Sequence, residues 1–380
     1  MPIDYTTLRL IWWLLLGILL IGFAVTDGFD FGVGMLLPFL TRNDNERRIL
    51  INTIAPTWEG NQVWLILGGG AIFAAFPLLY AVAFSGFYLA MMLVLIGLIL
   101  RPVGFKYRSK LTSSRWRSTW DILICLGSFI PSLVFGVAIG NVLQGVPFQF
   151  DDSLRIMYTG SFWQLLNPFA VLCGILTVLM FLLHGSLFIT TKTENNLQAR
   201  ARFQARIYGL LLIATFIGAG IWLKLTIPGY SIVSAIDTAG PANPLNKQIA
   251  VQLGAWLTNY NLHPWMMIAP IMGIAGAGIA ALLTNQGQGK LAFVSSALSI
   301  AGIILTFGFS IFPFLLPSST TPNASLLIWD ASSSQLTLFI MLIVTIIFMP
   351  IILLYTRWVY KVVGGKITLD TIMKHKGSYY

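Results

Sequence analysis

The chain has 380 residues, of which 57% are hydrophobic and only 9% are charged. Soluble domains carry about 25% charged residues, so this composition excludes a soluble globular protein and predicts a polytopic membrane protein. The net charge of +10 could indicate nucleic-acid binding, but the basic residues cluster in short loops between apolar segments. That pattern is typical of the cytoplasmic loops of membrane proteins, and we expect no nucleic-acid partner.

Nine apolar segments are long enough to be transmembrane helices, because a bilayer core of about 30 Å requires about 20 helical residues. In chain order they are 10–40, 51–79, 82–100, 119–144, 164–190, 207–226, 261–284, 291–316 and 336–358. The segment 51–79 is the least certain, because Glu59, Asn61 and Gln62 lower its hydropathy. If it were a loop, eight spans would remain. No cleavable signal peptide is expected, since no basic region precedes the first apolar segment.

The distribution of basic residues favours nine spans over eight. With nine, the loops and tail on one face carry 19 of the 23 Lys and Arg residues. The four on the other face are Arg9, Arg155, Lys224 and Lys247. Under the positive-inside rule, this arrangement predicts a periplasmic N-terminus and a cytoplasmic C-terminus. We predict one all-α transmembrane domain over 1–380, ending in a basic cytoplasmic tail over 359–380.

Two carboxylates interrupt the apolar segment 10–40. Asp27 and Asp30 are three residues apart, which puts them on the same face of a helix. A charged side chain at bilayer depth costs from about 2.5 to more than 10 kcal/mol unless it is compensated. We therefore expect both side chains to face protein or water and to have a function.

Other charged residues in or near the spans could join this pair. Glu59 lies in the second span and Asp121 near the start of the fourth, so the four acids could form an intramembrane cluster or relay. Alternatively, Asp121 caps the N-terminus of a helix, a position that favours acids. Arg101, at the end of the third span, either extends to the headgroups or turns inward to balance a buried acid.

Glycines are frequent near these acids. Gly28, Gly32 and Gly34 follow Asp27, and Gly68–Gly70 lie in the second span. Small residues allow membrane helices to approach closely, so we expect these glycines to serve packing.

No metal site is apparent in the sequence. His184, His263 and His375 lie in different segments, without the spacing of metal ligands and without a paired cysteine, so we expect no self-sufficient metal or haem site. Cys125 and Cys173 lie within predicted spans and are expected to be buried as small apolar residues. Nucleotide-binding motifs and a nucleophile elbow are also absent from the sequence.

Ordered motifs along nearly the whole chain carry a family resemblance. They include TDGFDFGVG at 26–34, GNQVW at 60–64, AFSGFY at 83–88 and RPVGF at 101–105. Further matches lie at 9–15, 42–44, 46–48, 140–141, 143–148, 243–245, 312–314, 317–319, 329–330, 333–338 and 350–355. With these motifs, the chain closely resembles subunit II of the cytochrome bd ubiquinol oxidases.

The resemblance implies a larger partner, subunit I, which ligates haems b558, b595 and d and oxidises quinol. Together the subunits would reduce oxygen to water in the bacterial inner membrane and generate proton-motive force. By the same resemblance, this chain would be a scaffold with no catalytic residue and no haem ligand of its own. Some relatives hold a structural ubiquinone in this subunit, and a small single-helix accessory subunit is usual.

The resemblance also assigns roles to individual residues. Asp27, Asp30 and Glu59 match positions proposed to line a proton path toward the haems. Trp64 and Arg101 match positions near the subunit interface or an oxygen route. Thr57 departs from the family, because several members carry histidine at this position.

Two other functions remain possible from the residues alone. In a secondary transporter the same acids would couple protons to a solute, although the chain lacks the matched helix interruptions and internal repeat of such proteins. In a purely structural assembly subunit the acids would be paired inertly with arginine or backbone groups.

Overall fold

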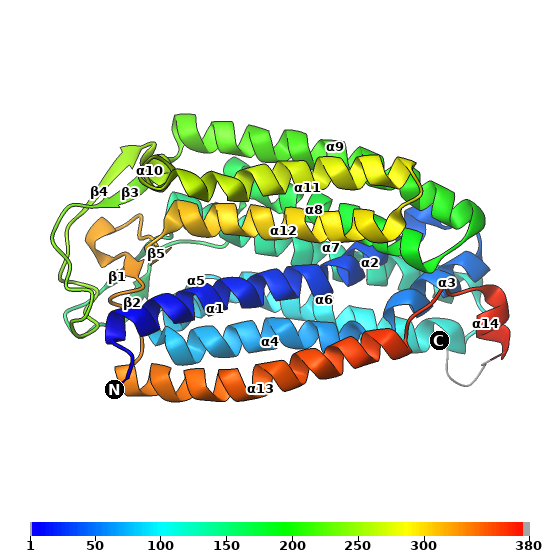
Figure 1. Cartoon of the computed structure of the whole chain (residues 1–380), viewed down its shortest axis with the longest axis horizontal. Coiled ribbons are helices and arrows are strands. Elements are labelled where there is room, and N and C mark those ends of the chain that lie inside the picture. The colour runs from blue at the N-terminus through cyan, green and yellow to red at the C-terminus, as the bar shows by residue number, and fades with distance from the viewer. Residues whose placement is uncertain (1, 375–380) are drawn as a thin grey trace.

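The computed structural model describes residues 2–374, so His375 and the end of the predicted basic tail lie outside the described part. The chain forms an elongated bundle whose long helices run roughly along one axis (Figure 1). The long helices are α1 (Tyr5–Thr26), α2 (Gly28–Leu40), α4 (Trp58–Ala75), α6 (Tyr88–Tyr107), α7 (Ser114–Gln144), α8 (Pro168–Lys192), α9 (Asn195–Thr226), α11 (Ile268–Asn285), α12 (Gly289–Ile311) and α13 (Gln335–Val362). The shorter ones are α3 (Asp44–Ile54), α5 (Pro77–Gly86), α10 (Thr258–Leu262) and α14 (Leu369–Lys374).

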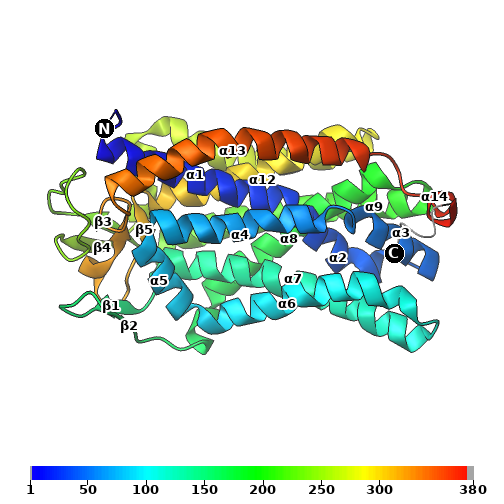
Figure 2. The ribbon, with the colours of Figure 1, turned by 90° about the horizontal axis from the view of Figure 1, so that it is seen from below.

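The structure supports nine membrane crossings. Within residues 2–374, eight helical segments are long and apolar enough to cross a membrane, and α1 with α2 counts as one of them. Helix α4 is not among the eight, and it is the span whose polar residues made it uncertain. It nevertheless runs between the two ends of the bundle (Figure 2), and with the eight it makes the ninth crossing predicted from the charge distribution.

The two ends of the bundle differ in structure. One, the hairpin end, carries three two-stranded antiparallel sheets (Figure 2). They pair β1 (Phe148–Phe150) with β2 (Ile156–Tyr158), β3 (Pro228–Ile232) with β4 (Ile249–Leu253), and β5 (Phe314–Leu316) with β6 (Leu326–Leu327). The other, the basic end, carries α3, α14, the turn after α6 and the turn between α8 and α9. Helix α1 begins at the hairpin end and α13 ends at the basic end (Figure 1), as an odd number of crossings requires. That the basic end faces the cytoplasm remains a prediction from charge.

Asp27 marks a break in the first crossing. Its backbone N–H ends α1 by donating to the Phe23 carbonyl, and its own carbonyl accepts from the Phe31 N–H at the start of α2. The predicted continuous span over 10–40 is therefore two helices joined at one of the acids.

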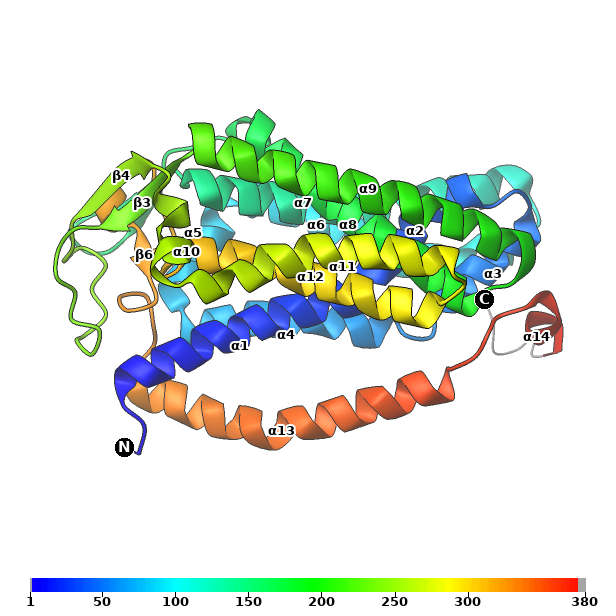
Figure 3. The ribbon, with the colours of Figure 1, turned by 45° about the horizontal axis from the view of Figure 1, so that its top comes forward.

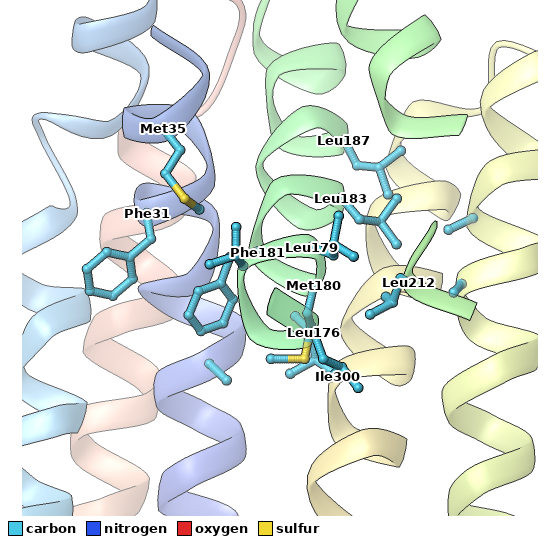
Figure 4. Close-up of a cluster of buried hydrophobic side chains, with 14 of the residues drawn as sticks. Phe31, Met35, Leu176, Leu179, Met180, Phe181, Leu183, Leu187, Leu212 and Ile300 are labelled. Carbon is cyan, nitrogen blue, oxygen red and sulfur yellow. The ribbon is translucent and has the colours of Figure 1, made fainter. Parts of the chain in front are cut away.

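Helix α8 lies at the centre of the bundle, and most of its residues are buried, whereas α13 at the edge is mostly exposed. In Figure 4, Phe31 and Met35 of α2 lie beside Phe181 of α8. The Phe31 and Phe181 rings are stacked, with their centroids 5.7 Å apart. The first crossing is thus held against the central helix by large apolar side chains.

Glycine permits the closest of these helix contacts. A Cβ at Gly32 would lie 2.0 Å from the Phe181 carbonyl oxygen, and one at Gly34 would lie 2.1 Å from Ser128 Oγ. The packing role predicted for Gly28, Gly32 and Gly34 is therefore confirmed. At Gly68–Gly70 a Cβ would meet nothing within 4 Å, so these glycines make no close helix contact within this chain, and their packing role stays a prediction. Of the three, Gly70 is exposed, Gly69 is partly buried and Gly68 is buried.

Candidate functional site

A buried ion pair joins the first and third crossings. Arg101 Nη2 of α6 donates to Asp27 Oδ1 at 3.0 Å, and Nη1 donates to Oδ2 at 3.5 Å. The two side chains are 1% and 0% exposed, and the guanidinium lies 4.1 Å from the centroid of the Phe31 ring. Of the two orientations open to Arg101, the structure shows the inward one, in which its charge compensates that of Asp27.

Asp30 has a neutral partner instead of a cation. Asn61 Nδ2 of α4 donates to Asp30 Oδ2 at 2.7 Å, and Tyr360 of α13 donates its hydroxyl to Asn61 Oδ1 at 2.5 Å. Asp30 is fully buried, and its Oδ1 has no hydrogen-bond partner among the described residues. A chain of polar groups therefore leads from Tyr360, near the basic end of α13, to the interior carboxylate.

Glu59 does not join this buried network. It lies in the first turn of α4 on an exposed face of the chain, and within residues 2–374 it makes no ion pair with the described cations. Val63, Ile66 and Phe73 are also exposed on α4, at 53%, 71% and 60%. Trp64 of the same helix turns inward and packs on Gly22 of α1. The acid therefore lies on the outer surface of this chain, next to an apolar face.

Asp121 belongs to a separate cluster at the basic end. It accepts from Arg108 Nη2 at 3.2 Å and forms an ion pair with Arg47 at 3.1 Å, and Arg108 also binds Asp44. Helix α7 begins at Ser114 with Ser113 as its cap, so the expectation that Asp121 caps this helix is wrong. The predicted cluster of four acids resolves into the Asp27–Asp30 pair, the exposed Glu59 and this arginine-bound Asp121.

Both ring nitrogens of the buried histidine, His184, are hydrogen-bonded. His184 of α8 hydrogen-bonds through Nδ1 to Ser296 Oγ at 2.7 Å and through Nε2 to the Val25 carbonyl at 3.0 Å. Its ring stacks on Phe293, with the centroids 4.3 Å apart. The structure describes no group of three or more His, Cys, Asp or Glu within residues 2–374 that could hold a metal. His184 therefore serves to link α8, α12 and the end of α1.

Sequence reasoning missed several of the interacting groups. In the sequence, Asn61 is a residue that lowers the hydropathy of its span and part of a family motif, and Tyr360 is part of the predicted tail; neither is predicted to contact Asp30. At the hairpin end, Lys247 donates to Asp330 at 2.6 Å, and both are buried. Burial lowers the pKa of Lys247 and raises that of Asp330, while their mutual attraction opposes both shifts. These partners are far apart in sequence, and no local pattern could have paired them.

A cavity of about 680 Å³ lies within the bundle. Its walls come from α1, α7, α8, α9, α11 and α12 and are mainly apolar, including Phe23, Leu176 and Phe216. Tyr260, Asn261 and Ser310 bring polar groups to its lining. A cavity of this size and character suits an elongated apolar molecule with one polar end.

These features define a multi-pass helical membrane protein that keeps an ion pair and a second carboxylate buried among its spans. Comparison with known proteins makes the assignment specific. Residues 8–363 match the family described as Cytochrome bd terminal oxidase subunit II. The chain is 53% identical over 378 residues, covering 100% of both chains, to "Cytochrome bd-I ubiquinol oxidase subunit 2" of Escherichia coli K12. It is 32% identical over 361 residues, covering 94% of this chain and 96% of the relative, to "Cytochrome bd ubiquinol oxidase subunit 2" of Bacillus subtilis.

The fold matches as well. A chain of the bd oxidase from Geobacillus thermodenitrificans superposes with a TM-score of 0.68 at 17% identity, covering 93% of this chain and 98% of that chain. The chain belongs to the family of subunit II of the cytochrome bd terminal oxidases. It is a multi-pass subunit of an oxidoreductase complex in the inner membrane, and it has a subunit I partner. This membership decides against the secondary transporter.

Proposed function

We propose that this chain supports subunit I in a quinol oxidase and supplies a proton path to the site of oxygen reduction. In this proposal the partner holds haems b558, b595 and d and oxidises ubiquinol, as the family resemblance implies; the names of the relatives themselves give the ubiquinol oxidase activity. Within residues 2–374, His184 does not fit a haem iron, because both of its ring nitrogens are hydrogen-bonded. His263 is exposed at the hairpin end. The complex would also include a small single-helix accessory subunit.

The proton path is proposed from the Asp30 environment. Asp27 forms an ion pair with Arg101, whereas Asp30 accepts a hydrogen bond from the Asn61 amide and lies beside the Asp27 carboxyl group. The charges of Asp27 and Arg101 already cancel, so a negative charge on the second buried carboxylate would be uncompensated. Binding a proton removes that charge. Asp30 would then take up and release protons, and Tyr360 and Asn61 would orient it from the basic end. The fully buried Asp30 carboxyl group, which has no cation of its own beside the Asp27–Arg101 pair, is the observation that carries this proposal.

Glu59 would act where the path leaves the chain. Its carboxylate is exposed on a membrane-embedded helix, which is costly in lipid, and the face beside it is apolar, with open glycines. Both features fit a surface covered by another protein. We propose that subunit I packs on this face of α4, so that Glu59 passes protons to the partner. Trp64 and Arg101 would hold α4 and α6 in place behind that interface, and Asp121 would act at the basic entrance.

The test is Asp30→Asn in the intact oxidase, with Asp152→Asn, an exposed residue at the hairpin end, as the matched control. We expect normal haem content, while turnover and proton uptake fall by about tenfold or more, since positioned proton-transfer groups contribute about 10²–10⁴ in rate. Normal turnover and proton uptake would overturn the path and leave the pair as inert support. Loss of haem d would show a role in assembly.

A structural ubiquinone in the 680 Å³ cavity is the second proposal. The apolar walls would hold the isoprenoid chain, and Tyr260 and Asn261 lie in the lining for the polar ring. Ala219→Phe places a large side chain in this cavity and should abolish co-purification of ubiquinone, measured by mass spectrometry of solvent extracts. Ala292→Val, a buried alanine that does not line the cavity, is the control. Unchanged quinone content in Ala219→Phe would refute the site.

A further inference from the structure

A groove of about 390 Å³ lies between the end of α2 and the first turns of α9, at the basic end. Its lining includes Phe39 and Leu40 from α2 and Arg200 and Phe203 from α9. Phe39 is 82% exposed and Phe203 59% exposed. Two aromatic side chains are therefore exposed at the basic end, which is otherwise rich in charged residues.

Cations surround this groove. Arg200 donates through Nε to the Leu40 carbonyl at 2.9 Å and through Nη2 to Glu46 at 2.6 Å. Glu46 also accepts from the Arg42 backbone N–H at 2.7 Å, and the Arg42 charge acts on the same carboxylate. Arg206 is exposed and lies three residues after Phe203, so it shares that face of α9. Three arginines against one glutamate leave a net charge of +2 beside the aromatic rings.

The position of the groove makes lipid its expected neighbour. The apolar part of α9 begins near residue 207, so Phe203 and Arg206 lie at the level of the headgroups on the predicted cytoplasmic side. Helix α9 lies on the opposite side of the bundle from α13 (Figures 1 and 3). Helix α9, which forms one wall of the groove, therefore lies away from α13 and from the face proposed for subunit I.

We propose that this groove binds one anionic phospholipid of the cytoplasmic leaflet. An acyl chain would lie against Phe39 and Phe203, which line the groove, while Arg42 and Arg206, which flank the groove without lining it, would attract the phosphate. Basic pockets between transmembrane helices on the cytoplasmic side recognise anionic headgroups in this way. Arg200 is already bound to Glu46 and Leu40, so it shapes the groove and leaves the other two arginines for the lipid.

The test uses the intact oxidase in nanodiscs made from equal parts of phosphatidylglycerol and phosphatidylcholine, followed by native mass spectrometry of retained lipid. The wild type should retain one phosphatidylglycerol that Arg42→Gln/Arg206→Gln loses. Each Lys or Arg near an anionic surface contributes about 1 kcal/mol. The preference for phosphatidylglycerol should therefore fall by about 30-fold for the pair.

The matched control is Lys110→Gln/Arg115→Gln, which removes the same charge from exposed positions at the basic end that lie after α6 and at the start of α7, and not beside α2 or on α9. It should retain the lipid as the wild type does. Phe39→Ala should weaken retention of both lipids while keeping the preference for the anionic one. Equal loss in the control pair, equal retention of phosphatidylcholine, or a protein bound in place of lipid would each overturn the proposal. Haem content confirms that every variant has assembled.

Discussion

Arg101→Gln removes the cation from the buried Asp27 pair and is the most direct test of how this bundle tolerates charge. Both side chains are at most 1% exposed, and the pair is joined by hydrogen bonds of 3.0 and 3.5 Å. Removing one partner of such a pair leaves an uncompensated buried charge and costs about 3 to 5 kcal/mol. We expect that loss in the free energy of unfolding, measured by titrating the complex with SDS in mixed micelles and following tryptophan fluorescence.

A double-mutant cycle separates the pair from other effects of the substitution. Asp27→Asn/Arg101→Gln leaves no unpaired charge and should cost clearly less than the two single changes together. Arg115→Gln, at an exposed position, should stay within about 0.5 kcal/mol of the wild type. A cost below about 1 kcal/mol for Arg101→Gln, or strict additivity in the cycle, would show that Arg101 does not compensate the charge of Asp27.

Three further predictions follow from other contacts. Gly32→Ala should lower the thermal midpoint of the complex strongly, because its Cβ would lie 2.0 Å from a carbonyl oxygen of α8, whereas Gly69→Ala should be tolerated, with nothing within 4 Å. Tyr360→Phe removes one hydrogen bond, so we expect a cost of about 0.5–1.5 kcal/mol and slower proton uptake with unchanged haem content; unaltered uptake would exclude Tyr360 from the path. Partial burial raises the pKa of Glu46, but hydrogen bonds from Arg200 and the backbone outweigh it and lower that pKa overall. Ionised Glu46 therefore stabilises the fold above the ordinary glutamate pKa, and this stabilisation is lost as the pH falls through the lowered pKa. In Glu46→Gln, we expect the free energy of unfolding, measured as a function of pH, to lack this contribution.

The membrane crossings were predictable because hydropathy and the bias of basic residues depend only on the local sequence of each segment and loop. Even the uncertain span at α4 was placed correctly by the position of the basic loops, since the positive-inside rule counts crossings independently of hydropathy. Boundaries were less predictable. Asp27 divides the first span into two helices, and α9 extends more than two turns beyond the predicted start of its span, because charged residues continue a helix outside the bilayer.

The candidate site was predictable in part. The cost of burying Asp27 and Asp30 identified both residues from sequence, and that same cost explains why Arg101 turns inward. Their other partners could not be inferred, because Asn61 and Tyr360 lie on helices whose position beside Asp30 depends on packing. Glu59 and Asp121 carry the same charge in the sequence, yet one lies on an exposed face and the other binds two arginines.

The sequence by itself determined a membrane protein with nine crossings, a basic face and two acids at a depth where acids are expensive, since each of these depends on composition and order along the chain. Only the tertiary structure decided which helix supplies the countercharge, which carboxylate is left with a neutral partner and which acid faces outward. Those outcomes depend on how α4, α6 and α13 pack around α2. That packing is set by contacts between residues as far apart as Asn61 and Tyr360, which no local pattern specifies.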